Sequence, residues 1–148
     1  MKIEQLHKAG FSLILLKPKR KQPLENDWAS KPKSKLSDIM DGYIEGCNIG
    51  FRPGVTSKTE DGMFIHGIDL DIRIAEDRDE AVAKLEELFG RKFLMSCPRV
   101  KSGSGGDSRH FYFKLPRPTR AKTVAHSKDK FFDEVKQNWR WRWEIEVF

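Results

Sequence analysis

Residues 63–72, MFIHGIDLDI, carry the pattern that decides the fold. Side chains alternate along a β-strand, so Ile68 and Leu70 fall on one side and Asp69 and Asp71 on the other. The apolar residues that flank both aspartates indicate a central strand with one buried face. Alternate positions on such a strand place the two carboxylates roughly 6.5–7 Å apart at the backbone, close enough to converge on a divalent cation.

Helices and strands are predicted on both sides of this strand, which favours an α+β fold. Helical spacing and stop signals predict helices over residues 2–9, 36–44 and 79–89, with a weaker helical segment over 129–137. Short apolar or alternating runs predict strands over residues 11–16, 47–51, 99–101, 110–115 and 139–148. The remaining stretches, 17–32, 52–62, 102–109 and 116–127, are predicted to be loops or turns.

Length and composition predict one globular domain, residues 1–148. The chain is long enough to bury a core without disulfide or metal support. Cys47 and Cys97 form no CxxC pair, and we expect both to be small buried residues. The longest apolar run, 11–16, is far shorter than a membrane span, and no signal-peptide pattern is present, so we expect a cytoplasmic protein without a membrane partner.

Charge is unevenly distributed along the chain, whose formal net charge is +6. Residues 99–142 hold 12 Lys or Arg against 4 Asp or Glu, whereas residues 59–89 hold 3 against 10. A basic segment of this kind suits a polyanionic partner. The acidic segment contains the paired aspartates.

The last ten residues show the clearest alternation. Trp139, Trp141 and Trp143 are expected on the core face, and Glu144 and Glu146 on the polar face. If this strand lies beside the strand of Asp69, Glu146 would supply a third carboxylate, with Glu144 as the competing candidate. Because the chain ends within this strand, we expect it to be a C-terminally truncated fragment of a longer protein.

The glycine-rich turn Ser102-Gly103-Ser104-Gly105-Gly106 can present backbone N–H groups to an anion. Basic and polar side chains stand on both sides of it and would add donors for a triphosphate. The predicted nucleotide-binding residues are Lys101, Ser104, Gly105, Gly106, Ser108, Arg109 and His110.

Carboxylates on neighbouring strands together with a phosphate cradle are what two-metal nucleotidyl transfer requires. Asp69, Asp71 and Glu146 would then be metal ligands for Mg²⁺ or Mn²⁺, and these three and His110 are the predicted catalytic residues. Two other readings stay open. One is a non-catalytic module that binds single strands on an aromatic, basic sheet face. The other is a glycosyltransferase in which the aspartates hold a nucleotide-sugar through Mn²⁺.

A set of short motifs, in this order, resembles the bifunctional primase/polymerase (prim-pol) domain of the archaeo-eukaryotic primase superfamily. They are Lys21-x-Pro23 with Trp28, Cys47-Asn48-Ile49-Gly50-Phe51, Gly67-Ile68-Asp69-Leu70-Asp71, the glycine-rich turn with Ser108-Arg109-His110-Phe111-Tyr112-Phe113, and Glu144-Ile145-Glu146-Val147. The resemblance runs over nearly the whole chain.

The resemblance implies an RRM-like sheet with flanking helices that makes and extends primers on a single-stranded DNA template from nucleoside or deoxynucleoside triphosphates, typically for phages, plasmids or other mobile elements. It implies that Asp69 and Asp71 form the first acidic motif, Ser108 and His110 the nucleotide-binding motif, and Glu146 the third metal-associated carboxylate. The sequence has no helicase motif and no zinc-binding stem, so a helicase domain or subunit is expected outside this chain.

Overall fold

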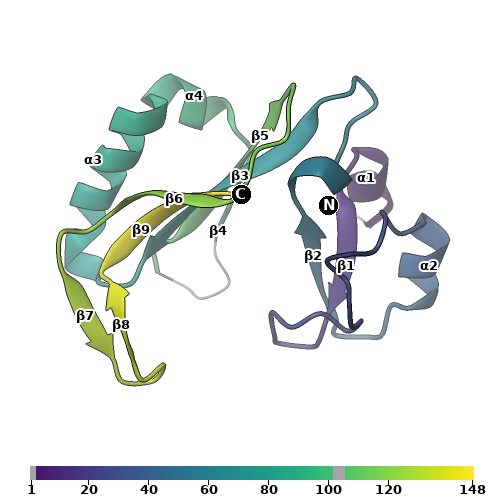
Figure 1. Ribbon diagram of the computed structural model, residues 1–148, viewed down its shortest axis with the longest axis horizontal. Coiled ribbons are helices and arrows are strands. Elements are labelled where there is room, and N and C mark those ends of the chain that lie inside the picture. Colours follow the sequence, from purple (N-terminus) through teal and green to yellow (C-terminus); the bar gives the residue numbers. More distant parts are fainter. Residues whose placement is uncertain (1–2, 102–105) are drawn as a thin grey trace. The chain divides into compact units, whose positions relative to one another are not determined.

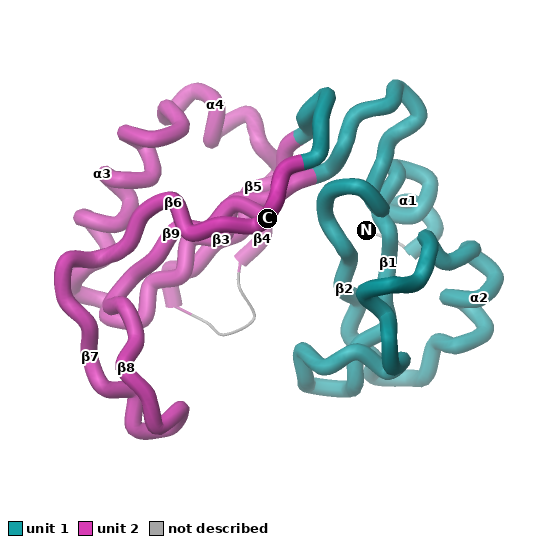
Figure 2. Tube along the Cα trace, viewed as in Figure 1, with its two compact units in different colours: residues 1–65, 114–118 teal, residues 66–113, 119–148 magenta. Residues whose placement is uncertain are grey.

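The computed structural model describes residues 3–101 and 106–148, which form two compact units (Figures 1 and 2). Residues 1–65 and 114–118 belong to the first unit, and residues 66–113 and 119–148 belong to the second. Both contain helices and strands, and the predicted α+β class is confirmed. Within the described ranges, no helix combines the length and apolar character needed to cross a bilayer.

The first unit is built on one antiparallel strand pair. Its elements are α1 (Ile3–Lys8), β1 (Ser12–Leu16), α2 (Leu36–Asp41), β2 (Asn48–Arg52) and the short 3₁₀ turn η1 (Gly54–Thr56). β1 pairs with β2 from Ser12↔Arg52 to Leu16↔Asn48. The predicted helix over 36–44 ends earlier, at Asp41, and Ile44 is exposed.

The second unit carries the main sheet, whose strand order is β4-β5-β3-β9-β6. Its elements are most of β3 (Phe64–Ile72), η2 (Ala75–Asp77), α3 (Arg78–Phe89), α4 (Arg91–Ser96), β4 (Arg99–Lys101), most of β5 (Arg109–Leu115), β6 (Lys122–His126), β7 (Lys130–Asp133), β8 (Asn138–Trp141) and β9 (Trp143–Val147). β4–β5, β3–β9 and β6–β9 are antiparallel pairs. β7 and β8 form a separate hairpin.

One face of the main sheet packs against α3 and α4. Ile68 and Leu70 of β3 and Ile145 of β9 join Ala81 and Leu85 of α3 in the buried core. Each of these side chains is at most 2% exposed. The predicted alternation holds over residues 68–71, where Ile68 and Leu70 are buried and the two aspartates lie on the opposite face; before it, Ile65 and His66 are both buried.

Two sequence predictions in the second unit are wrong, and one helix was not predicted. Residues 122–126, predicted as loop, form the edge strand β6, which pairs with β9. Its register shifts between Thr123 and Ala125, so the consecutive residues Val124 and Ala125 both pack against the core and no period-2 pattern results. Residues 130–133, predicted as helical, form β7. In the turn that follows, Asp133 accepts hydrogen bonds from the N–H groups of Val135 and Lys136. No helix was predicted where the structure has α4.

The predicted strand 139–148 is broken at Arg142. The N–H of Arg142 donates to the Ser127 hydroxyl, and its guanidinium binds Asp77, at the N-terminus of α3. β8 and β9 therefore belong to different sheets. Trp143 remains in the core, whereas Trp139 is 66% exposed.

Arg52 holds the long segment between β1 and α2 against the strand pair of the first unit. Its side chain is buried, and its guanidinium donates to the carbonyl oxygens of Trp28, Lys31 and Pro32 and to the Ser12 hydroxyl. Burial lowers the pKa of this guanidinium. A single side chain thus fixes a segment that has little regular structure.

We expect Arg52→Met to lower the free energy of unfolding of the first unit by about 1–3 kcal/mol, because a buried group loses several hydrogen bonds. Amide hydrogen exchange should accelerate from residue 17 to 35 and in β1 and β2. Arg20→Met, which removes an exposed guanidinium from the same unit, is the control. Equal exchange rates in the two variants would show that Arg52 has no such role.

Candidate functional site

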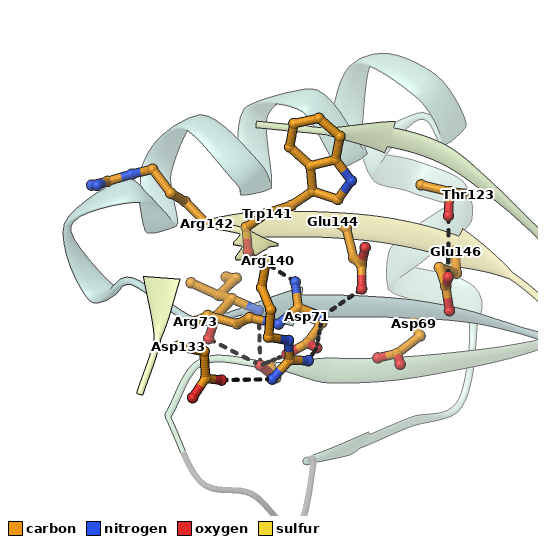
Figure 3. Close-up of polar contacts among 12 residues, drawn as sticks. Asp69, Asp71, Arg73, Thr123, Asp133, Arg140, Trp141, Arg142, Glu144 and Glu146 are labelled. Atoms are coloured by element: carbon orange, nitrogen blue, oxygen red, sulfur yellow. Dashed lines mark hydrogen bonds and ion pairs between the residues drawn. The ribbon is translucent and has the colours of Figure 1, made fainter. Parts of the chain in front are cut away.

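β3 presents Asp69 and Asp71 on the face of the sheet opposite the helices (Figure 3). Both side chains are 31% exposed. Their neighbours Ile68 and Leu70 point into the core, so the strand cannot rotate to turn the aspartates inward without exposing apolar surface. The core packing of β3 therefore fixes the two carboxylates on this face.

β9 adds two more carboxylates to the same face. The register pairs Asp69 with Glu146 and Asp71 with Glu144, as expected if the last strand lies beside β3. Directly opposed residues in an antiparallel pair have Cβ atoms about 4.5–5.5 Å apart, and like charges at that spacing repel. Four acidic side chains thus share one face of the sheet, and positive or hydrogen-bonding groups are needed nearby to offset their repulsion.

Arg73 compensates the pair formed by Asp71 and Glu144. Its Nη2 donates to Asp71 Oδ2 at 2.6 Å and to Glu144 Oε1, and its Nη1 donates to the carbonyl oxygen of Trp141 at 2.9 Å. The Arg73 side chain is only 10% exposed. Sequence reasoning missed this residue, although Arg73 follows Asp71 by two positions and so falls on the same face of the strand.

The β7–β8 hairpin brings a second arginine and a fifth carboxylate to this end of the site. Arg140 lies 3.9 Å from Asp71 Oδ2 and donates to Asp133 Oδ2 at 3.1 Å. The pKa of Asp133 is lowered, chiefly by the N–H group of Lys136 and then by Arg140. Asp133 was missed because its segment was predicted to be helical.

His110 and Tyr112 of β5 lie beside Asp69. His110 Nε2 is 3.1 Å from Asp69 Oδ1, and the Tyr112 hydroxyl is 3.4 Å from His110 Nδ1. Burial raises the pKa of Tyr112, and the negative charge of Asp69 raises it further. The two ends of the aspartate pair therefore differ, because arginines contact Asp71 and a histidine contacts Asp69.

Gly67 keeps the backbone open next to Asp69. It lies on the same face of β3, and a Cβ atom there would come within 2.4 Å of the Phe148 ring. The Phe148 ring also meets His110 edge-on, with ring centroids 6.1 Å apart. The absence of a side chain at Gly67 thus lets an aromatic ring border the Asp69 end of the site.

The side chain of Glu146 is engaged by β6, where its Oε1 accepts a hydrogen bond from the Thr123 hydroxyl at 3.1 Å (Figure 3). Among the residues that the structure describes, no three His, Cys, Asp or Glu side chains gather closely enough to hold a metal ion. The metal-binding role of Asp69, Asp71 and Glu146 stays a prediction. Glu144 also remains a candidate, because it lies opposite Asp71.

Ser108 joins β5 to the end of β3. Its hydroxyl oxygen accepts the N–H of Ile72 at 2.9 Å and lies 3.3 Å from Asp71 Oδ1. The residue is 3% exposed. The hydrogen bonds of the Ser108 hydroxyl are therefore made within the protein, and they position the end of the strand that carries Asp71.

Two of the other predicted nucleotide-binding residues, Lys101 and Arg109, lie on the opposite face of their strands from His110. Arg109 faces the helices, where it lines a cavity of about 310 Å³ with Leu70 and Phe111. Lys101 pairs with Arg109 in the β4–β5 register and so shares its face. Gly106 has a left-handed φ of +63°, while Ser104 and Gly105 lie outside the described residues. Most of the turn around which a concavity was expected lies outside the described residues, so the nucleotide-binding role of Lys101, Arg109 and His110 stays a prediction.

Neither the curated proteins nor the solved structures include a significant match to this chain. A family model described as bifunctional DNA primase/polymerase, N-terminal, matches residues 3–143. The matched region contains Asp69, Asp71, His110 and Asp133 and ends one residue before Glu144. Because the match covers nearly the whole length, the chain belongs to the family of bifunctional DNA primase/polymerase N-terminal domains.

Proposed function

We propose that this chain is a template-dependent nucleotidyltransferase that synthesises and extends primers for DNA replication. Its family consists of primase/polymerase domains. The observation that carries the proposal is the pair Asp69 and Asp71, held on one strand face with His110 at 3.1 Å from Asp69. We infer a replicon of phage, plasmid or mobile-element type, and a helicase domain or subunit outside this chain.

The donor set fits Mg²⁺ or Mn²⁺, because carboxylate oxygens are the ligands that these ions prefer. Mg²⁺ is usually held by one or two protein carboxylates together with substrate phosphates, so Asp69 and Asp71 suffice without a third protein ligand. Glu146 or Glu144 would complete the set after a change of side-chain rotamer. When bound, such ions lower the pKa of an attacking hydroxyl and neutralise charge on the leaving pyrophosphate.

The protein's own groups have distinct tasks in this proposal. Asp69 and Asp71 hold the ions, and His110, which borders the exposed Asp69 end, contacts the triphosphate. Arg73 and Arg140 hold Asp71 in place and balance the acidic group while no substrate is bound. Ser108 keeps the end of β3 in register with β5.

A non-catalytic single-strand-binding module is the second candidate. The exposed aromatic side chains of the β7–β8 hairpin favour strand binding. The acidic group repels phosphate, so it would weaken the binding of a nucleic-acid strand to this face. We therefore favour catalysis for the acidic face.

Asp69→Asn and Asp71→Asn should each reduce incorporation of labelled nucleotides on single-stranded DNA by roughly 10²-fold or more in Mg²⁺ or Mn²⁺. Loss of one ligand removes several kcal/mol of charge stabilisation, and 1.4 kcal/mol corresponds to tenfold in rate. Asp79→Asn, at a side chain that is 92% exposed, is the matched control. Titration calorimetry with Mn²⁺ and a nucleoside triphosphate should show weakened binding in the two site variants alone. Wild-type incorporation and binding in these variants would exclude the proposed metal site.

Ser108→Ala separates a structural role of this hydroxyl from a nucleotide-binding role. The substitution leaves the partly buried N–H of Ile72 without the Ser108 acceptor, which should cost about 1 kcal/mol of stability. We expect a lower midpoint in thermal unfolding, with Ser37→Ala, at an exposed serine, as control. Unchanged stability with weaker nucleotide binding would instead place the Ser108 hydroxyl on the substrate.

A further inference from the structure

The β7–β8 hairpin has two faces with different chemistry. Opposed residues share a face, and the register pairs Phe131 with Arg140 and Asp133 with Asn138 on the side that meets the acidic site. The other side carries two further pairs, Lys130 with Trp141 and Phe132 with Trp139. Figure 3 shows Trp141 and Arg140 directed to opposite sides of the hairpin. The aromatic face is defined here as Lys130, Phe132, Trp139 and Trp141.

Ring contacts already order this aromatic face. The His126 imidazole, from β6, stacks on the Trp141 indole with centroids 3.7 Å apart and an interplanar angle of 8°. The Lys130 ammonium lies 4.3 Å from the centroid of the same indole. The Phe132 and Trp139 rings meet edge-on at 5.7 Å. His126 and Lys130 thus hold Trp141, while Phe132 and Trp139 form a separate outer pair on the same face.

The outer pair is open to solvent. Trp139 is 66% exposed and Phe132 is 44% exposed. Large aromatic side chains are ordinarily covered, and exposed groups of them mark binding surfaces. Because the face that they share also carries Lys130, the surface offers flat rings and positive charge together.

The charges around the hairpin indicate which class of molecule binds to the aromatic face. Residues 122–142 hold six Lys or Arg against three Asp or Glu, and Lys128, Lys130 and Lys136 are exposed. Cores of protein–protein interfaces are depleted of lysine, whereas proteins that hold single strands combine basic side chains with aromatic rings on which bases stack. A DNA duplex does not offer its base faces to such rings.

We propose that the aromatic face of the β7–β8 hairpin is a docking surface for single-stranded DNA. Bases stack on Trp139 and Phe132, and the exposed lysines contact the phosphates. The assignment of this strand as template rests on the proposed function. It is supported by Arg140, which on the other face of the same hairpin lies 3.9 Å from Asp71. A DNA strand bound to the aromatic face would thus lie on the opposite side of the hairpin from the acidic site.

The test compares Trp139→Leu with Trp139→Phe. Leucine keeps an apolar side chain but cannot stack, whereas phenylalanine keeps a ring. Stacking of one base contributes about 1–3 kcal/mol, which corresponds to roughly 5- to 100-fold in affinity. Fluorescence anisotropy with labelled oligo(dT) should show this loss for Trp139→Leu and for Phe132→Ala, and a much smaller change for Trp139→Phe. Met95→Ala, at a 73% exposed apolar residue of α4, is the matched control.

Salt dependence separates the ring contribution from the charge contribution. Trp139→Leu removes no charge, so the slope of log affinity against log salt should stay at its wild-type value. The triple substitution Lys128→Ala, Lys130→Ala and Lys136→Ala should reduce that slope. Circular dichroism confirms that each variant is folded before its affinity is compared.

The two proposals can fail independently. Trp139→Leu should keep metal-dependent triphosphate binding, and Asp69→Asn should keep oligo(dT) binding in EDTA. Wild-type oligo(dT) affinity in Trp139→Leu would overturn the docking surface and leave nucleotidyl transfer intact. Trp139-dependent DNA binding in a protein that never incorporates nucleotides would support the surface and overturn the proposed function.

Two further outcomes would assign the surface to another occupant. Equal or tighter binding of oligo(rU), lost in the same variants, would overturn the assignment to DNA. A wild-type protein that elutes as a dimer in gel filtration, and a Trp139→Leu protein that elutes as a monomer, would show that a second copy covers the rings.

Discussion

The pairing of β3 with β9 sets the constraint that organises this site. It places Asp69 opposite Glu146 and Asp71 opposite Glu144, so four negative charges meet on one sheet face. That arrangement is tolerable only if positive or hydrogen-bonding groups approach from neighbouring segments. The surrounding segments supply them: Arg73 extends β3, Arg140 comes from β8, His110 from β5, and Thr123 from β6.

The two ends of the acidic group differ in how firmly they are compensated. Asp71 is bound by an arginine that is 10% exposed and is itself fixed by the Trp141 carbonyl. Asp69 has one imidazole contact, and that histidine is 28% exposed. Among the described residues, Asp69 therefore has fewer charged contacts than Asp71.

Sequence alternation predicted β3 and β9, whose inward side chains enter the core, and missed β6 and β7. Apolar residues alternate with acidic ones along β3 and along β9, so the acidic residues fall on the site face. The register of β6 on β9 is irregular, so the consecutive residues Val124 and Ala125 both pack against the core, and β7 lies in a separate hairpin, where side-chain polarity carries little information. The contact of Asp133 with Arg140 depends on that hairpin, so sequence reasoning could not find it.

The break at Arg142 links the core to the surface proposed for DNA. An unbroken strand would place Trp139, Trp141 and Trp143 on one buried face, as the sequence pattern predicts. The contacts of Arg142 with Ser127 and Asp77 end that regularity, and only Trp143 enters the core. Leaving a tryptophan exposed forgoes roughly 2–3 kcal/mol of burial. A ligand that covers Trp139 would recover part of that free energy. The break at Arg142, which the sequence pattern did not predict, therefore leaves a tryptophan exposed on a surface suited to stacking.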